Sequence, residues 1–146
     1  MSERVLVVDA TDQVLGRMCS IIAKRLLEGY RVYVVNAEKT RISGRKESFI
    51  REYGSFLEVK SVRNPKHTPR HPRNPVSYVR SVVKSMLPVD RPKGMEAFRR
   101  LRVYCGWPSS VKGEAVKFKD ADASRLGRRS FALSDLKGFF NVPEAD

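Results

Sequence analysis

The chain has 146 residues, of which 41% are hydrophobic, and a formal net charge of +13 at pH 7. That length suits a single domain over residues 1–146, and the absence of about 18 consecutive uncharged apolar residues argues against a membrane span. The charge favours a polyanionic partner, with nucleic acid preferred over an anionic membrane surface. Cys19 and Cys105 lack paired spacing and are predicted to be reduced, buried side chains.

The first elements in the chain predict a βαβ unit over residues 4–37. Residues 4–9 and 31–37 are short apolar runs rich in β-branched side chains, which is typical of strands covered on both faces. Thr11 or Asp12 is predicted to cap the helix between them, and Gly29 to end it. The apolar face of this helix follows the spacing i, i+3, i+4, i+7 and comprises Leu15, Met18, Cys19, Ile22 and Leu26.

Less regular elements follow. Residues 43–54 predict a helix that Ser43 caps and Gly54 ends, and residues 56–62 predict an exposed edge strand. Asn74 is expected to cap a helix over residues 75–87, and residues 94–101 predict another helix. A buried strand is expected over residues 101–106. The C-terminal segment 109–146 is weakly patterned, with one expected helix near residues 134–140.

The segment of residues 63–75 is a basic, proline-rich loop without any aliphatic side chain. It contains four prolines, four Lys or Arg residues and both histidines of the chain. Proline fixes φ and favours an extended backbone, which loses less entropy on docking than a flexible chain does. We therefore expect an extended loop that presents cations to phosphates, with histidines that can stack on exposed bases.

An enzymatic alternative starts from Asp9, which ends the first predicted strand, where α/β sheets usually bind ligands. With Asp12 it could form a pair of catalytic carboxylates acting on a nucleotide or nucleic acid, or a Mg²⁺ site. The simpler interpretation is that Asp9 orders the turn while Asp12 caps the helix. Neither of the glycine-rich phosphate-binding motifs is present in the sequence.

Metal chemistry has little support in the sequence. His67 and His71 have the i, i+4 spacing of a metal-binding helix, but Pro69 lies between them and interrupts a regular helix. Residues 120–131 begin like a calcium loop, yet Arg125 and Phe131 stand where that loop needs Gly and Glu. We expect no metal and no cofactor.

The positive charge is concentrated in the middle of the chain. Residues 41–102 carry sixteen Lys or Arg against five Asp or Glu, which is eleven of the thirteen net charges. Such a concentration predicts a nucleic-acid-binding surface, and the lack of a recognisable helix-turn-helix or zinc finger favours RNA over DNA. The predicted RNA-binding residues are Arg17, Arg41, Arg45, Lys46, Arg63, Lys66, His67, Arg70, His71, Arg73, Arg80, Lys84, Arg91, Lys93, Arg99, Arg100 and Arg102.

Several motifs occur together in one order along the chain. They are D-x-x-x-x-V-L-G-R-x-x-S (residues 9–20), A-K-R-L-L-E-G (23–29), V-V-N-A-E-K (34–39), I-S-G (42–44), M-L-P (86–88) and G-M-E-A-F-R-R-L-R-V-Y-x-G (94–106). In this combination the chain resembles the L-thirteen family of large-subunit ribosomal proteins, in its archaeal and eukaryotic form. The match covers residues 5–108. Lys84 and Ser85 stand where the family usually has Arg-Gly, which puts in question any close approach that requires glycine at Ser85.

The resemblance implies an α/β class: a three-layer α/β/α fold around a four-stranded, mainly parallel sheet. It implies a structural constituent of the large ribosomal subunit, not an enzyme, which packs large-subunit ribosomal RNA during early assembly on the cytoplasmic ribosome. The implied partners are that RNA and neighbouring ribosomal proteins, with no membrane and no small-molecule substrate. It also carries RNA-binding roles to Arg17, Arg45, Lys84 and the run 93–102. Besides the ribosomal and enzymatic functions, a third interpretation is a free DNA-binding regulator.

Overall fold

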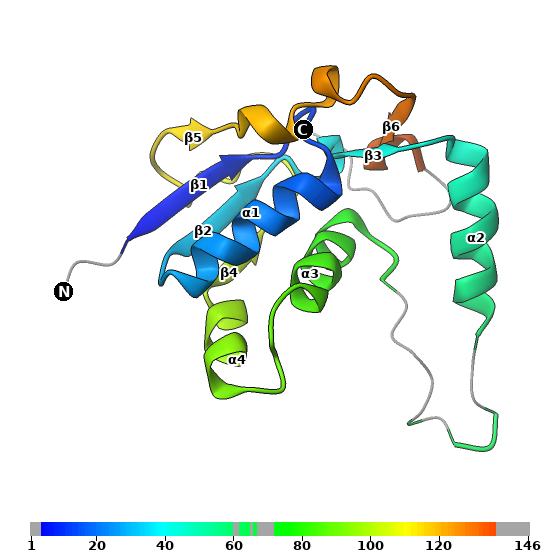
Figure 1. Ribbon diagram of the computed structural model, residues 1–146, viewed down its shortest axis with the longest axis horizontal. Coiled ribbons are helices and arrows are strands. Elements are labelled where there is room, and N and C mark those ends of the chain that lie inside the picture. The colour runs from blue at the N-terminus through cyan, green and yellow to red at the C-terminus, as the bar shows by residue number, and fades with distance from the viewer. Residues whose placement is uncertain (1–3, 60–61, 65, 67–71, 137–146) are drawn as a thin grey trace.

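The computed structural model describes residues 4–59, 62–64, 66 and 72–136. Its main sheet has the strand order β4-β2-β1-β5, and every neighbouring pair is parallel. The strands are β1 (Val5–Asp9), β2 (Arg31–Val35), β4 (Leu101–Val103) and β5 (Ala115–Val116). The predicted α/β class and four-stranded parallel sheet are confirmed (Figure 1).

The predicted βαβ unit is confirmed, with α1 (Leu15–Leu27) between β1 and β2. All five side chains of the predicted apolar face are buried. Gly29 has φ +101° and the Gly29 N–H donates to the Leu26 carbonyl, so it ends the helix as expected. The predicted cap is wrong: the helix begins after Val14, with no side-chain cap. The Val14 N–H is instead bound to the Ala121 carbonyl at 2.6 Å, which keeps this part of the chain extended.

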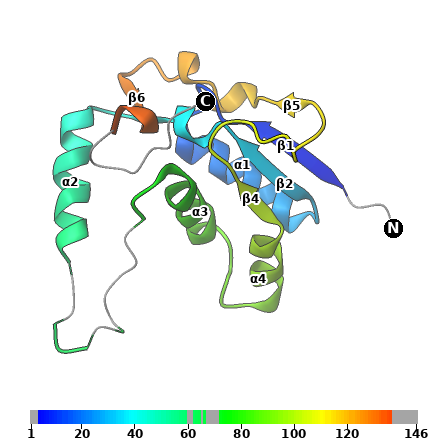
Figure 2. The same cartoon turned by 180° about the vertical axis from the view of Figure 1, so that it is seen from behind.

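The helices α1, α3 (Pro75–Ser85) and α4 (Pro92–Arg99) share one hydrophobic core with Val8, Val32 and Val34 of the sheet. The opposite face, which carries Val7 and Val35, packs against Val111. Figure 2 shows this side of the sheet, where the chain returns from β4 to β5. In the described residues, the third layer of the expected α/β/α arrangement is thus a loop segment in place of a helix.

Strand order explains this division of the two faces. From β1 to β2 to β4 the chain steps in one direction, so right-handed crossovers put their helices on one face. The step from β4 back to β5 runs in the reverse direction, and a right-handed crossover there must use the other face. Only about eleven residues separate these strands, which is too few for a long covering helix.

Within the described residues, the prediction for residues 43–62 is wrong in three respects. α2 (Lys46–Glu58) passes through Gly54, and residues 56–58 are helical instead of forming an edge strand. The helix begins after Arg45, so Ser43 does not cap it. Phe49, Tyr53 and Phe56 form a stripe at helical spacing, with neighbouring ring centroids 5.4 and 5.5 Å apart. These ring contacts outweigh the roughly 1 kcal/mol that glycine costs inside a helix.

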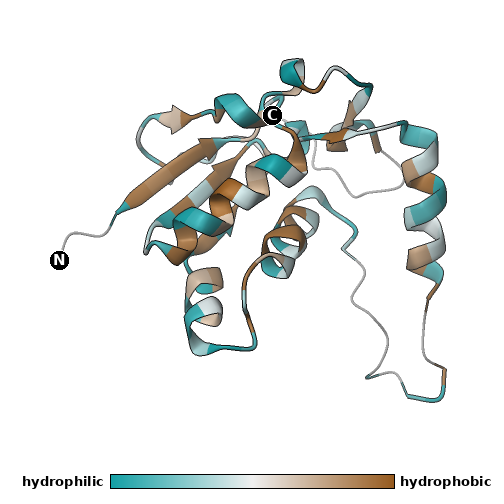
Figure 3. Ribbon diagram, viewed as in Figure 1, coloured by the Kyte–Doolittle hydropathy of each residue, from teal (hydrophilic) through white to brown (hydrophobic). Residues whose placement is uncertain are grey.

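The predicted helices and strand of the second half are largely confirmed. Asn74 caps α3 by accepting a hydrogen bond from the Ser77 N–H at 2.7 Å. α4 starts at Pro92, two residues before its predicted start, and β4 is the expected strand. No helix in the part that the structure describes is long and apolar enough to cross a membrane. Apolar residues concentrate in the strands and on the inward faces of the helices (Figure 3).

The C-terminal segment contributes short elements. They are β5, the 3-10 helices η3 (Lys119–Ala121), η4 (Ala123–Arg125) and η5 (Leu133–Leu136), and β6 (Ser130–Ala132). β6 pairs antiparallel with β3 (Arg41–Ser43), which follows the 3-10 helix η1 (Ala37–Lys39). η5 falls at the start of the helix expected near residues 134–140, whose remaining residues lie outside the described part of the chain. Leu133 and Leu136 are buried, so this segment completes the core.

Candidate polyanion-binding surface

The α3 and α4 helices turn their cations toward solvent because their apolar faces are buried. Val79 and Val83 of α3 and Ala97 of α4 are fully buried in the core. The cations of the α3–α4 surface, all of them exposed, are Arg80, Lys84, Arg91, Lys93 and Arg99. The Arg80 guanidinium lies 5.0 Å from the centroid of the Phe98 ring, which joins the two helices by a cation–π contact.

Ser85 is accommodated at the end of α3 without a close backbone approach. The side chain is exposed, and its hydroxyl donates to the Val82 carbonyl at 2.6 Å. The exchange of the family's Arg-Gly for Lys84 and Ser85 therefore keeps one exposed cation and fits the helix. Nothing inside the described fold requires glycine at this position.

Two predicted RNA-binding arginines have partners within the protein. The Arg100 guanidinium is half-buried and donates to the Leu26 carbonyl at 2.6 Å, at the C-terminal end of α1. Arg41 is half-buried as well and donates to the Ser130 hydroxyl at 2.8 Å and to the Ser130 carbonyl at 2.9 Å. Each of these side chains fixes one element to another, so part of its donor capacity is already used.

The remaining predicted cations are exposed on other parts of the fold. Arg17 lies on α1, Arg102 on β4 and Arg45 and Lys46 at the start of α2. Arg63, Lys66 and Arg73 of the basic loop fall within the described residues, whereas His67, Arg70 and His71 lie outside them. Arg102 donates to the carbonyls of Arg99 and Leu101 at 3.1 and 3.0 Å, which holds its side chain near the end of α4.

Acidic partners are scarce around these cations. The ion pairs found between described residues are Arg25–Glu28 and Arg125–Asp120, each at 3.1 Å. Neither pair contains a predicted RNA-binding residue. The charges of the predicted RNA-binding residues are therefore not neutralised by ion pairs within the described fold. A surface of this kind attracts polyanions and counter-ions because its positive potential is not cancelled by nearby carboxylates.

Sequence inspection overlooked Arg128 and Arg129, which are exposed just before β6. The near-neutral charge of residues 109–146 as a whole concealed them. The local run L-G-R-R-S was the available signal, but its position beside β3 depends on strand pairing that the sequence does not reveal.

Asp9 orders the turn after β1. One of its carboxylate oxygens accepts hydrogen bonds from the Thr11 N–H at 3.0 Å, the Thr11 hydroxyl at 2.7 Å and the Asn36 amide at 3.1 Å. Burial by itself would raise the pKa of Asp9, but these hydrogen bonds and the charge of Lys117 outweigh it, so the pKa lies below its ordinary value. Asp9 is thus an ionised structural carboxylate, as the simpler interpretation predicted.

The position of Asp12 differs from the helix cap that the simpler interpretation expected. Its side chain is exposed, its φ is +57°, and it does not cap α1. Its backbone N–H donates to the Lys39 carbonyl and its carbonyl accepts from the Ala123 N–H, which joins three segments. The described residues contain no cluster of three or more His, Cys, Asp or Glu side chains that could hold a metal ion.

Replacing Asp9 by Asn should lower the free energy of unfolding and make it depend less on pH in the acid range. The folded-state pKa is below the unfolded value of about 3.9, so the contribution of Asp9 is present above that pH and is lost as pH falls through the folded value. Replacing the charged acceptor of three hydrogen bonds by a neutral one should cost on the order of 1 kcal/mol at pH 7. Urea unfolding at pH 7 and at about pH 3 measures both effects.

Asp12→Asn is the matched control for this experiment. Asparagine tolerates the left-handed backbone of Asp12, so stability should stay within a few tenths of a kcal/mol of wild type. Equal stability of wild type and Asp9→Asn at pH 7 would contradict a structural role for Asp9.

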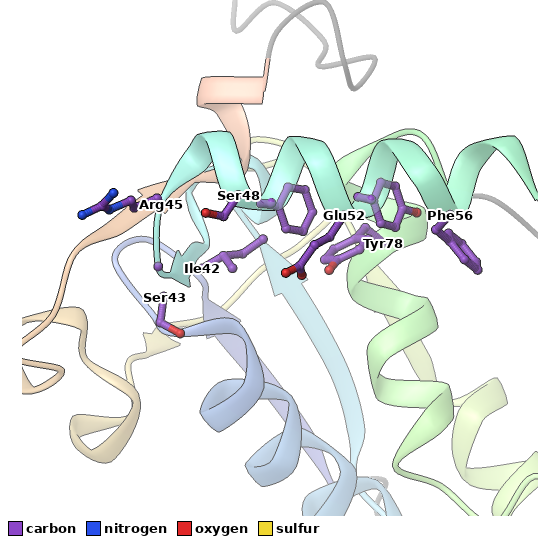
Figure 4. A pocket seen from close by; sticks show the side chains of 10 residues that line it. Ile42, Ser43, Arg45, Ser48, Glu52, Phe56 and Tyr78 are labelled. Carbon is purple, nitrogen blue, oxygen red and sulfur yellow. The ribbon is translucent and has the colours of Figure 1, made fainter.

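A pocket of about 520 Å³ opens between β3, α2 and α3 (Figure 4). Its walls are mainly apolar and aromatic, with Ile42, Phe49 and Tyr78 among them, and Glu52 is its carboxylate. Burial, followed by the neighbouring Tyr78, raises the pKa of Tyr53 to about 12, so this phenol is neutral at pH 7. Asp9 and Asp12 do not line the pocket, and Glu52 is the one carboxylate among the described residues that do, so these residues contain no pair of carboxylates.

The cysteines are not reactive nucleophiles. Burial raises the pKa of Cys19 to about 12, and burial together with Glu38 raises that of Cys105 to about 11. At neutral pH both are therefore thiols, and the thiolate is the reactive form. Both cysteines are free, and the predicted burial is confirmed for Cys19 but wrong for Cys105, which is half-buried.

The fold and its surface define a class of protein: a basic α/β scaffold whose exposed, predicted RNA-binding cations form no ion pair with the described residues. Comparison with known families is more specific. Residues 3–110 match the model of the family described as Ribosomal protein L13, and the chain belongs to that family.

Curated relatives agree with this assignment. The chain is 41% identical to the large ribosomal subunit protein uL13 of Sulfolobus acidocaldarius over 136 residues, which is 92% of this chain and 91% of the relative. It is 45% identical to the protein of the same name from Aeropyrum pernix over 132 residues, or 89% and 85% of the two chains. With the Methanopyrus kandleri protein of that name, it shares 41% identity over 86% of this chain and 79% of the relative. The predicted family is confirmed.

Proposed function

We propose that this protein is a structural constituent of the large ribosomal subunit, where it binds and packs large-subunit ribosomal RNA during early assembly. Family membership supports the role, and the observation that carries it is the set of exposed cations without acidic partners on the described fold. Neighbouring ribosomal proteins are the second class of partner, and the cytoplasmic ribosome is the location. The proposal includes no catalytic step and no cofactor.

The physical mechanism is neutralisation of phosphates by a rigid scaffold. The buried core of α1, α3, α4 and the sheet fixes the backbones that carry the cations, so little conformational entropy is lost by the scaffold on binding. Each phosphate that a Lys or Arg contacts releases condensed counter-ions, and this release drives association with RNA. Arginine can bind a phosphate through two parallel hydrogen bonds, which adds geometric preference to charge.

The enzymatic alternative is not favoured by any contact in the described fold. The alternative needs Asp9 free to act on a substrate, whereas its carboxylate already accepts two hydrogen bonds from Thr11 and one from Asn36. It also needs Asp12 beside it, but the interactions of Asp12 join backbone segments. We therefore assign both residues to structure.

Co-sedimentation with large subunits tests the proposed function. Wild-type protein should sediment with the subunits and remain bound up to about molar salt, where screening shortens to about 3 Å. A variant with Arg63, Lys66, Arg70 and Arg73 replaced by Ala should lose about 3 from the slope of log affinity against log salt, at about 0.7–0.9 per phosphate. Its thermal unfolding midpoint should hardly change, since these side chains lie in a loop without aliphatic residues.

The two halves of this experiment answer different questions. Absence of the wild-type protein from large subunits would contradict the proposed function. An unchanged slope of log affinity against log salt in the loop variant would show only that the basic loop does not contact RNA phosphates. A footprint on duplex DNA, without sedimentation with ribosomes, would favour the regulator interpretation.

A further inference from the structure

A second group of cations lies on the two-stranded ribbon formed by β3 and β6. The ribbon pairs Arg41 with Ala132 and Ser43 with Ser130, although about 90 residues separate the strands in sequence. Beyond the last pair, the Gly44 N–H donates to the Arg129 carbonyl at 2.7 Å. Figure 1 shows β3 and β6 next to the start of α2 and apart from α4, with α1 and α3 between them.

The ribbon has a fixed base. The Arg41 guanidinium crosses from β3 to β6 through its two hydrogen bonds with Ser130. Phe131 is buried and its ring centroid lies 5.4 Å from that of Phe49, so β6 is also anchored to α2. Side chains that project from this ribbon therefore start from backbone positions that are held on both strands.

Four exposed cations gather at the open end of the ribbon: Arg45, Lys46, Arg128 and Arg129. None of them is in an ion pair with a described residue. The exposed acids nearest in the chain are Glu47, in the first turn of α2, and Asp135, whose carboxylate accepts a hydrogen bond from the Ala132 N–H at 3.0 Å. Folding therefore brings like charges together, which costs free energy unless an anion binds between them.

We propose that Arg45, Lys46, Arg128 and Arg129 form a second site for RNA backbone phosphates, named here the β3–β6 cation cluster. This inference rests on the proposed function and assigns the C-terminal segment a part in it. Three of the four side chains are arginines, which bind phosphate oxygens through paired hydrogen bonds. Because α1 and α3 separate β3 and β6 from α4, the cluster and the cations near α4 suit two separate stretches of RNA backbone.

The test is a salt titration of binding to a transcript of large-subunit ribosomal RNA, with wild type and the double variant Arg128→Ala/Arg129→Ala. The slope of log affinity against log salt should fall by about 1.5 in the variant, at about 0.7–0.9 per phosphate. The thermal midpoint should stay unchanged, because the two side chains are exposed and the hydrogen bond of Arg129 uses its backbone carbonyl.

The matched control is Lys24→Ala/Lys112→Ala, which removes the same charge from exposed positions outside the cluster. Its slope should remain within about 0.5 of wild type. An equal loss of slope in the control, or no loss in Arg128→Ala/Arg129→Ala, would overturn the cluster while leaving the proposed function standing. Failure of the wild-type protein to bind the transcript at any salt would overturn both.

Discussion

Replacing the five cations of the α3–α4 surface by alanine should lower the slope of log RNA affinity against log salt by about 4, since each phosphate contact contributes about 0.7–0.9. The substituted residues are Arg80, Lys84, Arg91, Lys93 and Arg99, all of them exposed. By this measure the surface should account for the largest single share of binding. At low salt the variant should still bind through the basic loop, and the loss should appear mainly as a change of slope.

A stability measurement separates lost binding from lost folding in this variant. The contact of Arg80 with the Phe98 ring is removed, and such contacts contribute about 0.5–1 kcal/mol at exposed sites. The thermal midpoint should therefore fall by only a few degrees. An unaltered salt slope in a variant that remains folded would show that this surface does not contact RNA phosphates.

Gly94→Ala is expected to be the most damaging single substitution for the fold. A Cβ at this position would overlap the carbonyl group of Pro88 and lie 2.9 Å from the Val89 backbone nitrogen. These are backbone atoms, so relief requires α4 to move away from the turn that precedes it. Overpacking of this kind costs about 3 kcal/mol, which should lower the thermal midpoint by roughly 10 °C.

Gly16→Ala provides the control for this substitution. Gly16 lies in the first turn of α1, and a methyl group added there would meet no heavy atom within 4 Å, so alanine fits. Alanine is favoured over glycine in helices by up to about 1 kcal/mol, and stability should stay the same or rise slightly. If Gly94→Ala unfolded at the same temperature as wild type, the close packing of α4 on Pro88 would be contradicted.

The Gly94 contact also gives a physical reason for two of the motifs that suggested the family. M-L-P ends at Pro88 and G-M-E-A-F begins at Gly94, and in the structure these two residues meet. The Arg91 N–H donates to the Pro88 carbonyl at 3.0 Å, which closes the turn between them. The motifs therefore specify one tight connection that sets α4 against the core.

Short stretches of sequence predicted several helices and strands of this protein, because the signals for these elements come from neighbouring residues. Strand-length apolar runs and one helical stripe were sufficient for the βαβ unit, since burial of those side chains requires the observed elements. Asn74 followed by proline was sufficient for the start of α3, because capping involves only neighbouring residues.

Tertiary structure decided what depends on residues far apart in the chain. Gly54 stays helical because of ring contacts along α2, and the Val14 N–H is bound by Ala121, which delays the start of α1. Strand pairing of β3 with β6 brings Arg128 and Arg129 to the start of α2.

By itself, the sequence determined the α/β class, the family motifs and the concentration of positive charge. Only folding decided which cations face solvent and which, like Arg41 and Arg100, hold one element to another. The physical reason is that non-local hydrogen bonds and packing have no signature within a short window of sequence.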